Sequence, residues 1–209
     1  MQKNFFICLL LLINTNFLIA QKVSVGDSLT IELKKAKIAP TLFYTQQNVR
    51  VKGEGLEKIM IRSRIRSIIK KNVDVNPFSL LDTVNKVRYK MVEFVGYKPF
   101  SIGVPTYQGK ELLKSKLLNN RGRPYQNVPD YDPSIKDTFY DFSFNKYENI
   151  ACKINFGTNK NPIVSETYYA PITMTSFIAD AFFAVKKFER EPFFILYYGN
   201  EEVGHINKD

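Results

Sequence analysis

The sequence Ile59-Met-Ile-Arg-Ser-Arg-Ile-Arg-Ser-Ile-Ile69 decides how the rest of the chain is interpreted. Residues two apart along a β-strand point to the same face, so the isoleucines at 61, 65 and 69 would share one face with two serines. The opposite face would carry three cations, which are Arg62, Arg64 and Arg66. A helix would scatter both sets around its whole circumference, so the pattern predicts a half-buried strand.

Residues 1–20 have the pattern of a secretory signal peptide. One early lysine precedes an apolar run over residues 5–13, and a second apolar run ends at Ala20. Leu18 departs from the small residue expected three positions before the cut. A retained anchor is the alternative, although the run is shorter than the roughly 20 apolar residues that cross a bilayer. We expect cleavage after Ala20, no transmembrane span after cleavage, and an exported protein that is periplasmic, cell-surface or secreted.

Residues 21–209 have the length of a single domain with a sizeable core. The removed segment contains one lysine and no acid, so 29 cationic and 20 acidic side chains leave this domain near +9. Such an excess favours anionic partners, and it leaves anionic glycan, lipid headgroup and envelope protein open. The alternative is a basic surface without a dedicated ligand.

The chain offers few residues for metal or cofactor chemistry. The mature domain has one cysteine, Cys152, and therefore no internal disulfide, and the chain has one histidine, His205. A zinc or copper site of the usual ligand set needs more such ligands, and most serine or cysteine hydrolases need a histidine base. Gly53-Glu-Gly55 lacks the lysine and hydroxyl residue of a nucleotide-binding loop. We expect no cofactor, no metal and no enzymatic activity.

Several other segments alternate like strands and are separated by short turns. They cover residues 29–33, 42–51, 87–95, 139–144 and 150–156, with one short strand near 100–104. Lys34, Lys35 and Lys37 would form a basic turn after the first of them. Residues 192–198 predict a buried strand that turns at Gly199-Asn200 and pairs with residues 203–206. This spacing is typical of an antiparallel meander or sandwich.

Two segments are compatible with a helix. Residues 109–120 place Leu113 and Leu117 at helical spacing before Asn119-Asn120, which predicts one short helix near residues 110–118. Residues 168–188 fit either a helical stripe or an alternating strand, and periodicity alone does not decide between them. We favour a strand there. Residues 121–137 would form the longest irregular loop.

Two acids in this loop raise the alternative of a glycan-active hydrolase. Asp130 and Asp132 could bind calcium or serve as paired catalytic carboxylates. Their spacing matches neither a complete calcium motif nor a defined catalytic pair, so ordinary turn residues are the competing interpretation.

The arginine row is the leading candidate for a binding site. Arg62, Arg64 and Arg66 would project at intervals of about 6.6 Å and could contact phosphate or sulfate groups. If the strands pair as a meander, further cations would lie nearby, namely Lys70, Lys71, Arg88 and Lys90. The row could instead be a solvated face that opposes edge-to-edge aggregation. No aromatic residue is interleaved with it, which argues against single-stranded nucleic acid as the partner.

Tyrosines in predicted loops are the second group of candidates. Tyr97, Tyr107, Tyr125 and Tyr131 lie where a ring could face a protein or sugar, although it could also fold back over the core. We include Tyr125 and Tyr131 with the arginines as candidate ligand-binding residues.

Three stretches carry a resemblance to a known class of domain. They are residues 62–69 leading into Asn72-Val-Asp-Val-Asn-Pro-Phe-Ser-Leu-Leu-Asp82, then Arg88-Tyr89, and finally Phe193-Phe-Ile-Leu-Tyr-Tyr-Gly199. Together they resemble the immunoglobulin-like β-sandwich domains of small exported bacterial proteins of unknown function, of the Bacteroidetes type. The Cys-Trp-Cys hallmark of immunoglobulin domains is absent, since the chain has no Trp. The resemblance implies fold and export, and it implies no functional residue.

The sequence therefore predicts a signal peptide over residues 1–20 and one mainly all-β domain over 21–209, an antiparallel immunoglobulin-like β-sandwich with one short helix. We expect a non-catalytic binding or envelope-associated module. The alternatives are a polyanion-binding protein that uses the basic strand face, and a glycan-active hydrolase that uses the loop carboxylates.

Overall fold

The computed structural model describes residues 21–38, 55–69, 72–98, 107–126, 128–158 and 160–206. The predicted signal peptide, the strands predicted at 42–51 and 100–104, and the cations Lys70 and Lys71 lie outside these residues, as does most of Gly53-Glu-Gly55. No helix in the described ranges is long and apolar enough to cross a membrane.

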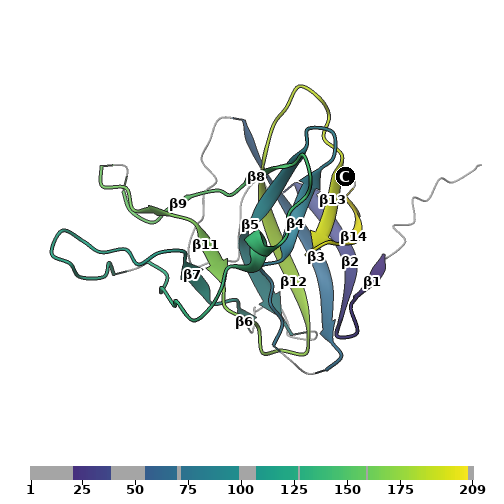
Figure 1. Cartoon of the computed structure of the whole chain (residues 1–209), viewed down its shortest axis with the longest axis horizontal. Coiled ribbons are helices and arrows are strands. Elements are labelled where there is room, and N and C mark those ends of the chain that lie inside the picture. The colour runs from purple at the N-terminus through teal and green to yellow at the C-terminus, as the bar shows by residue number, and fades with distance from the viewer. Residues whose placement is uncertain are drawn as a thin grey trace, which may run out of the picture.

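The protein is mainly antiparallel β-structure (Figure 1). Ten strands form one sheet, with the order β1-β2-β3-β12-β5-β4-β13-β14 and with β6 and β8 added at β5. The strands are β1 Lys22–Val25, β2 Leu29–Ile38, β3 Leu56–Ser67, β4 Phe78–Asp82, β5 Val87–Tyr97, β6 Tyr107–Gln108, β8 Glu148–Ile150, β12 Ser176–Lys186, β13 Phe194–Tyr198 and β14 Glu201–Ile206. Two small sheets join β7 Glu111–Leu113 to β11 Thr167–Tyr169, and β9 Ile154–Asn155 to β10 Val164–Ser165.

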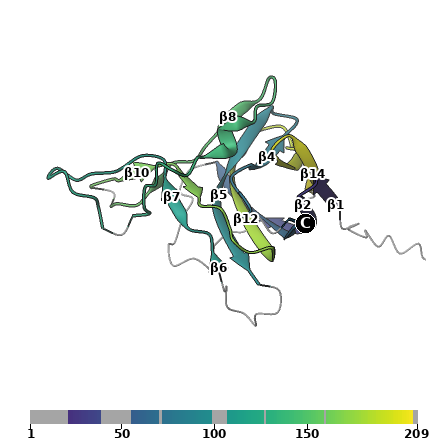
Figure 2. The ribbon, with the colours of Figure 1, turned by 60° about the horizontal axis from the view of Figure 1, so that its bottom comes forward.

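Strand β5 makes the large sheet curl. Its first half pairs with β4 and, in parallel, with β8, whereas its second half pairs with β12 and β6. The sheet bends along this strand until β14 lies beside β1 and β2, so that the strands surround a common core (Figure 2). Gln21 and Leu33 lie against Gly204 of β14 at this junction, since a Cβ atom at Gly204 would be 2.4 Å from the Gln21 side-chain oxygen and 3.2 Å from a Leu33 methyl carbon. The result is a nearly closed, barrel-like layer.

The core lies inside the curled sheet and follows the period of two that strands impose. In β3, Ile61 and Ile65 are buried inward beside Ile31 of β2, as the opening pattern predicts. Ile69 lies beyond the end of β3 and is 47% exposed, so it does not belong to that face. The core also contains large aromatic side chains, which are Phe78, Tyr89, Phe94, Phe177, Phe183 and Phe194.

The structure confirms several of the predicted strands. Strand β5 covers the segment predicted at 87–95, and β13 and β14 form the predicted C-terminal hairpin. The segment at 168–188, which fitted two patterns, forms β11 and β12 rather than a helix. Strand β12 is central, because it pairs with both β3 and β5.

Four predictions about local structure are wrong. The strand predicted at 150–156 is interrupted, because β8 ends at Ile150 and β9 covers only Ile154–Asn155. The helix predicted near residues 110–118 is instead β7 followed by irregular chain, because Leu112 and Leu113 are buried by pairing with β11. The strand predicted at 139–144 is a 3-10 helix, η1 Thr138–Asp141, which begins where the Asp137 side chain accepts a hydrogen bond from the Phe139 amide. The basic turn at residues 34–37 is also wrong, because β2 continues through these residues to Ile38 with a bulge between Leu33 and Lys35.

Candidate polyanion-binding face

The predicted arginine row lies on the outer face of the sheet. In β3, Ile61, Ser63 and Ile65 are buried, whereas Arg62 and Arg64 are half-buried and Arg66 is exposed. Strand β3 is internal, since β2 pairs with one edge and β12 with the other. The row therefore does not protect a free sheet edge, and it can contact only what approaches the face.

Arg62 is occupied by an internal acid. Asp180 of β12 lies opposite it, and the guanidinium Nε and Nη2 atoms each donate a 2.7 Å hydrogen bond to one carboxylate oxygen. The Tyr97 hydroxyl donates to the same carboxylate, and the guanidinium lies over the Tyr97 ring at 5.5 Å. Asp180 is fully buried, and its hydrogen bond to Arg62 raises the pKa of the guanidinium. Arg62 thus forms a structural ion pair with Asp180 at the edge of the candidate site.

Glu32 is the other acid on this face. Its carboxylate accepts a hydrogen bond from Lys34 and lies 3.7 Å from the Arg64 guanidinium. The Lys34 hydrogen bond is the main reason that the pKa of Glu32 is lowered, and the charges of Arg64 and Arg66 lower it further. One carboxylate therefore faces three cations, and the charge around Glu32 remains positive.

The continued strand β2 enlarges the basic face beyond the predicted row. Its register places Lys35 opposite Arg62 and Lys37 opposite Met60, while β1 places Lys22 opposite Glu32. Partners in adjacent antiparallel strands share a face. Apart from the buried pair of Lys58 with Glu93, which cancels, the outer face of β1, β2 and β3 and its border with β12 therefore hold seven cations and two acids, a formal charge of +5. The cations are Lys22, Lys34, Lys35, Lys37, Arg62, Arg64 and Arg66, and the acids are Glu32 and Asp180.

Four of these cations form no ion pair within the described part of the chain. They are Lys22, Lys35, Lys37 and Arg66, and each is exposed. The sheet spaces such side chains by about 4.8 Å between strands and about 6.8 Å along a strand. A regular array of this kind suits a ligand that repeats its negative charges along a chain.

Two cations that were expected near this row lie elsewhere. Strand β12 separates β3 from β5, so Arg88 and Lys90 do not extend the face. Arg88 is fully buried beneath η1, where its guanidinium donates to the carbonyls of Phe139 and Phe142 at 3.1 and 2.5 Å. Burial lowers the pKa of Arg88 to about 10. Lys90 is also buried, and its ammonium lies 2.5 Å from Asp137.

The candidate tyrosines are not brought together with the arginines. Tyr125 is half-buried and Tyr131 is 41% exposed, and both lie in the long irregular segment after β7. Tyr97 is the aromatic residue beside Arg62, but its hydroxyl is bonded to Asp180. The exposed aromatic side chains of the described residues are Tyr131, Tyr140, Phe188 and Phe193, none of which lies on β1, β2 or β3.

The loop carboxylates have local structural partners. Asp130 pairs with Lys110 at 3.0 Å on the surface, and Asp132 accepts hydrogen bonds from the amide and hydroxyl of Ser134 at 2.9 and 2.6 Å. These bonds lower the pKa of Asp132. Asp132 therefore has the turn-forming role that was one of its predicted interpretations, whereas Asp130 forms a surface ion pair and a β-bridge with Leu112.

The described residues hold no group of three or more His, Cys, Asp or Glu that could bind a metal ion. His205 contacts Glu202 at 3.0 Å on the surface, and Cys152 packs half-buried against a small hydrophobic cluster that includes Met60, Val92 and Phe182. Burial raises the pKa of the Cys152 thiol, which disfavours the nucleophilic thiolate.

Comparison with known proteins gives no relative from which a function could be transferred. No family model, no curated protein and no solved structure matches this chain. The arguments about function therefore depend on the geometry and charge of the protein itself.

Sequence reasoning missed Lys35 and Lys37 as members of the face. Three lysines within four residues were interpreted as a turn, although Ala36 and Ile38 alternate with Lys35 and Lys37 as strand residues do. That alternation was the signal that could have found them. The bulge between Leu33 and Lys35 hid it by shifting the period at that point.

Proposed function

We propose that this protein is a non-catalytic binding module that holds a linear polyanion on the outer face of β1, β2 and β3. The observation that carries the proposal is the array of seven cations and two acids on one sheet face, four of whose cations form no ion pair within the described residues. Guanidinium and ammonium groups bind sulfate and phosphate through charge-assisted hydrogen bonds. An anionic glycan is the ligand class that this face supports best.

The absence of stacking platforms on this face favours a glycan over single-stranded nucleic acid. Binding of single strands relies on aromatic side chains on which successive bases stack. The described residues of β1, β2 and β3 present no exposed aromatic ring beside the cations. Export by a signal peptide over residues 1–20 and an immunoglobulin-like arrangement of the strands belong to the same proposal. Export would expose the face to envelope or extracellular glycans.

Heparin chromatography and titration across a salt series test the proposal. The test variant is Lys35→Ala/Arg64→Ala/Arg66→Ala, which retains the structural pair of Arg62 with Asp180. Each lost anion contact reduces the slope of log K against log salt by about one unit, so we expect a reduction of up to about three units.

A second variant controls for net charge. Arg121→Ala/Arg123→Ala/Lys160→Ala removes the same three charges from exposed loops far from the face along the sequence and in Figure 1. We expect the control to retain most of the salt slope. Equal losses in the two variants would mean that heparin responds only to total charge, and the sheet face would then not be a site. Circular dichroism establishes that both variants are folded.

A further inference from the structure

A second basic surface projects from the other side of the molecule. Two segments form it, residues 115–126 and residues 153–164 without 159, and we call them together the arm. Both leave the same end of the β7–β11 sheet, where the Lys114 amide donates a 3.2 Å hydrogen bond to the Glu166 carbonyl. In Figure 1 the arm extends to the left, away from β1 and β2 at the right.

The first segment ends in a turn organised by one asparagine. The Asn119 side-chain oxygen accepts hydrogen bonds from the amides of Arg121 and Arg123 at 2.9 and 3.1 Å. The Asn119 amide donates to the Arg123 carbonyl at 2.8 Å, and Gly122 takes a φ of +69°, which glycine adopts at little cost. The turn therefore holds both arginine backbones in place while their side chains remain exposed.

The second segment is a hairpin organised in the same way. The Asn155 side-chain oxygen accepts 3.0 Å hydrogen bonds from the amides of Gly157 and Ile163. A Cβ atom at Gly157 would lie 2.3 Å from the Asn161 carbonyl oxygen, so the backbone closes tightly there. Lys160 lies in the loop of this hairpin and is exposed.

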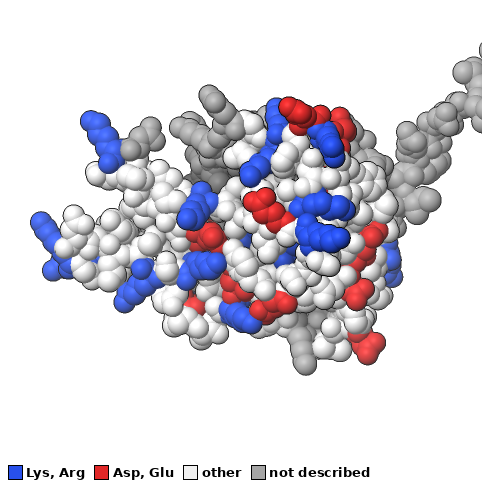
Figure 3. Space-filling view, turned by 45° about the horizontal axis from the view of Figure 1, so that its top comes forward, with Lys and Arg blue, Asp and Glu red and all other residues white. Residues whose placement is uncertain are grey.

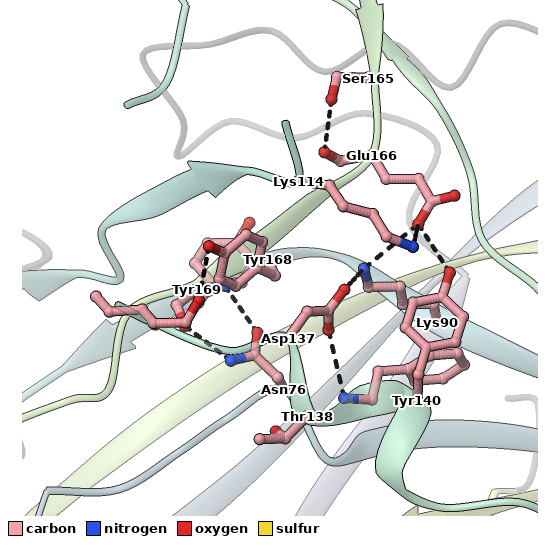
Figure 4. Close-up of polar contacts among 12 residues, drawn as sticks. Asn76, Lys90, Lys114, Asp137, Thr138, Tyr140, Ser165, Glu166, Tyr168 and Tyr169 are labelled. Carbon is pink, nitrogen blue, oxygen red and sulfur yellow. Dashed lines mark hydrogen bonds and ion pairs between the residues drawn. The ribbon is translucent and has the colours of Figure 1, made fainter. Parts of the chain in front are cut away.

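The base of the arm is fixed by polar groups that range from buried Lys90 and Asn76 to exposed Lys114 and Tyr140 (Figure 4). Glu166 accepts hydrogen bonds from Tyr140 at 2.7 Å and from Lys114 at 3.1 Å, and Lys90 lies 3.8 Å away. Asn76 pairs with the backbone of Tyr169 in β11, donating to its carbonyl at 2.8 Å and accepting from its amide at 2.7 Å. These contacts tie the base of the arm to β5, η1 and β11.

The arm carries positive charge without acids. Its cations are Lys116, Arg121, Arg123, Lys153 and Lys160, and neither segment contains Asp or Glu, so its formal charge is +5. None of these five forms an ion pair within the described residues. Figure 3 shows Lys and Arg along the projecting loops with no Asp or Glu beside them, whereas both signs are mixed on the body.

Exposed aliphatic side chains accompany these cations. Leu118 and Val164 are each 46% exposed. Leu118 forms a bridge with Pro124, directly beside the arginine turn, and Val164 pairs with Asn155 in the hairpin. Soluble polyanions gain little from contact with aliphatic groups, whereas a membrane interface binds both cations and apolar side chains.

We propose that the arm docks on an anionic phospholipid surface. The cations contact the headgroups, and Leu118 and Val164 enter the boundary between headgroups and acyl chains. The docking does not depend on the polyanion-binding face, because the arm leaves the β7–β11 sheet rather than β1, β2 or β3. The two surfaces together would let one molecule hold a glycan chain close to a membrane.

Vesicle co-sedimentation of the whole protein tests this proposal. The probes are vesicles of phosphatidylcholine alone and vesicles with one quarter phosphatidylglycerol, at 50 and 300 mM salt. Binding is expected only to the anionic vesicles and to weaken with salt. Removal of three cations in Arg121→Ala/Arg123→Ala/Lys160→Ala should lower the partition coefficient by about a hundredfold.

A second variant separates lipid docking from simple attraction between charges. Leu118→Ser/Val164→Ser keeps the net charge, and it should lower vesicle binding by about tenfold or more while heparin binding stays unchanged. The matched control Lys35→Ala/Arg64→Ala/Arg66→Ala should lose heparin binding and keep most vesicle binding.

Two outcomes would overturn the proposal. One is that the protein fails to bind anionic vesicles. The other is that the serine variant binds them as well as the wild-type chain, because the arm would then be a purely electrostatic surface. Failure of the sheet face appears in the heparin titration instead, so the two proposals are tested apart.

Discussion

Replacing Glu111 by glutamine tests the electrostatics of the sheet that supports the arm. Glu111 lies on β7 opposite Tyr169, with its Oε1 atom buried and accepting no hydrogen bond from the described residues. Burial is the main reason that its pKa rises from 4.5 to about 7, and the charge of Glu93 raises it further. A hydrogen bond with Thr167 opposes the rise.

The sign of the effect follows from the two protonation states. The folded protein binds the Glu111 proton more tightly than the unfolded chain, so this group's contribution to stability falls as pH rises from 4.5 through about 7. A difference of about 2.5 pH units corresponds to about 3 kcal/mol, since each unit is worth about 1.4 kcal/mol. Most of this loss falls between pH 5 and pH 9. Glutamine has nearly the same shape and does not ionise, so Glu111→Gln should abolish it.

Urea unfolding at pH 5, 7 and 9, followed by far-ultraviolet circular dichroism, measures this difference. We expect the free energy of unfolding of the variant, relative to the wild-type chain, to increase by about 2 to 3 kcal/mol from pH 5 to pH 9. Glu201→Gln at an exposed strand end is the matched control for the loss of one carboxylate. If Glu111→Gln and the wild-type chain show the same pH dependence, the carboxyl is not held in an environment that disfavours its charge.

Three further substitutions test particular contacts. Asp180→Asn removes the buried acid that pairs with Arg62. It should lower the free energy of unfolding by about 2 kcal/mol in urea unfolding, and it should raise the affinity for heparin in a titration because Arg62 is released. Arg88→Ala should cost about 3 kcal/mol or more in urea unfolding, since it empties a packed site and leaves the Phe139 and Phe142 carbonyls without their donor. Gly157→Ala should shift amide NMR signals across residues 153–164 and leave those of β3 and β12 unchanged, because its Cβ would collide with the Asn161 carbonyl; shifts spread through the large sheet would contradict this local account.

The alternation of apolar and polar residues predicted most of the strands of the large sheet. It succeeded at β3, β5 and β12 because each buries one side chain in two against the same core. At residues 168–188 a helical stripe fitted equally well, so alternation alone did not decide there, and the favoured strand is confirmed by β12. The alternation could not show that β12 lies between β3 and β5, because pairing between distant segments leaves no mark on local periodicity.

The errors arose where tertiary contacts override local preference. Leucines at 112, 113 and 117 have the spacing of a helix, but β11 offers Leu112 and Leu113 a partner strand and buries them. Arg88 and Lys90 were expected beside the arginine row on the condition that the strands pair as a meander. Residues 137–142 cover them and supply carbonyl and carboxylate acceptors, which a local pattern does not reveal.

The sequence predicted on which face of the sheet the candidate site lies, but it did not predict which residues make up the site. The row of three arginines lies on the outer face, as its period of two requires. Its partners depend on register, which pairs Arg62 with Asp180 some 118 residues away and places Lys35 and Lys37 beside the row. Register is set by contacts along whole strands, so neither the neutralised arginine nor the added lysines could be identified from residues 59–69 alone.

The distribution of charge gives the two proposals a common physical basis. Residues 21–209 carry a net charge near +9, and the basic face and the arm carry a formal +5 each, so the remainder of the domain is close to neutral. A protein surface that served only solubility would not need its positive charges clustered in two places, since charges of both signs spread over the surface suffice. Like charges that gather on one face repel each other and lower the stability of the fold. The basic face and the arm lie on separate elements, and each has cations that form no ion pair with an acid of the described residues. The repulsion within each of them lowers the stability of the fold, and binding to an anionic partner would offset that loss.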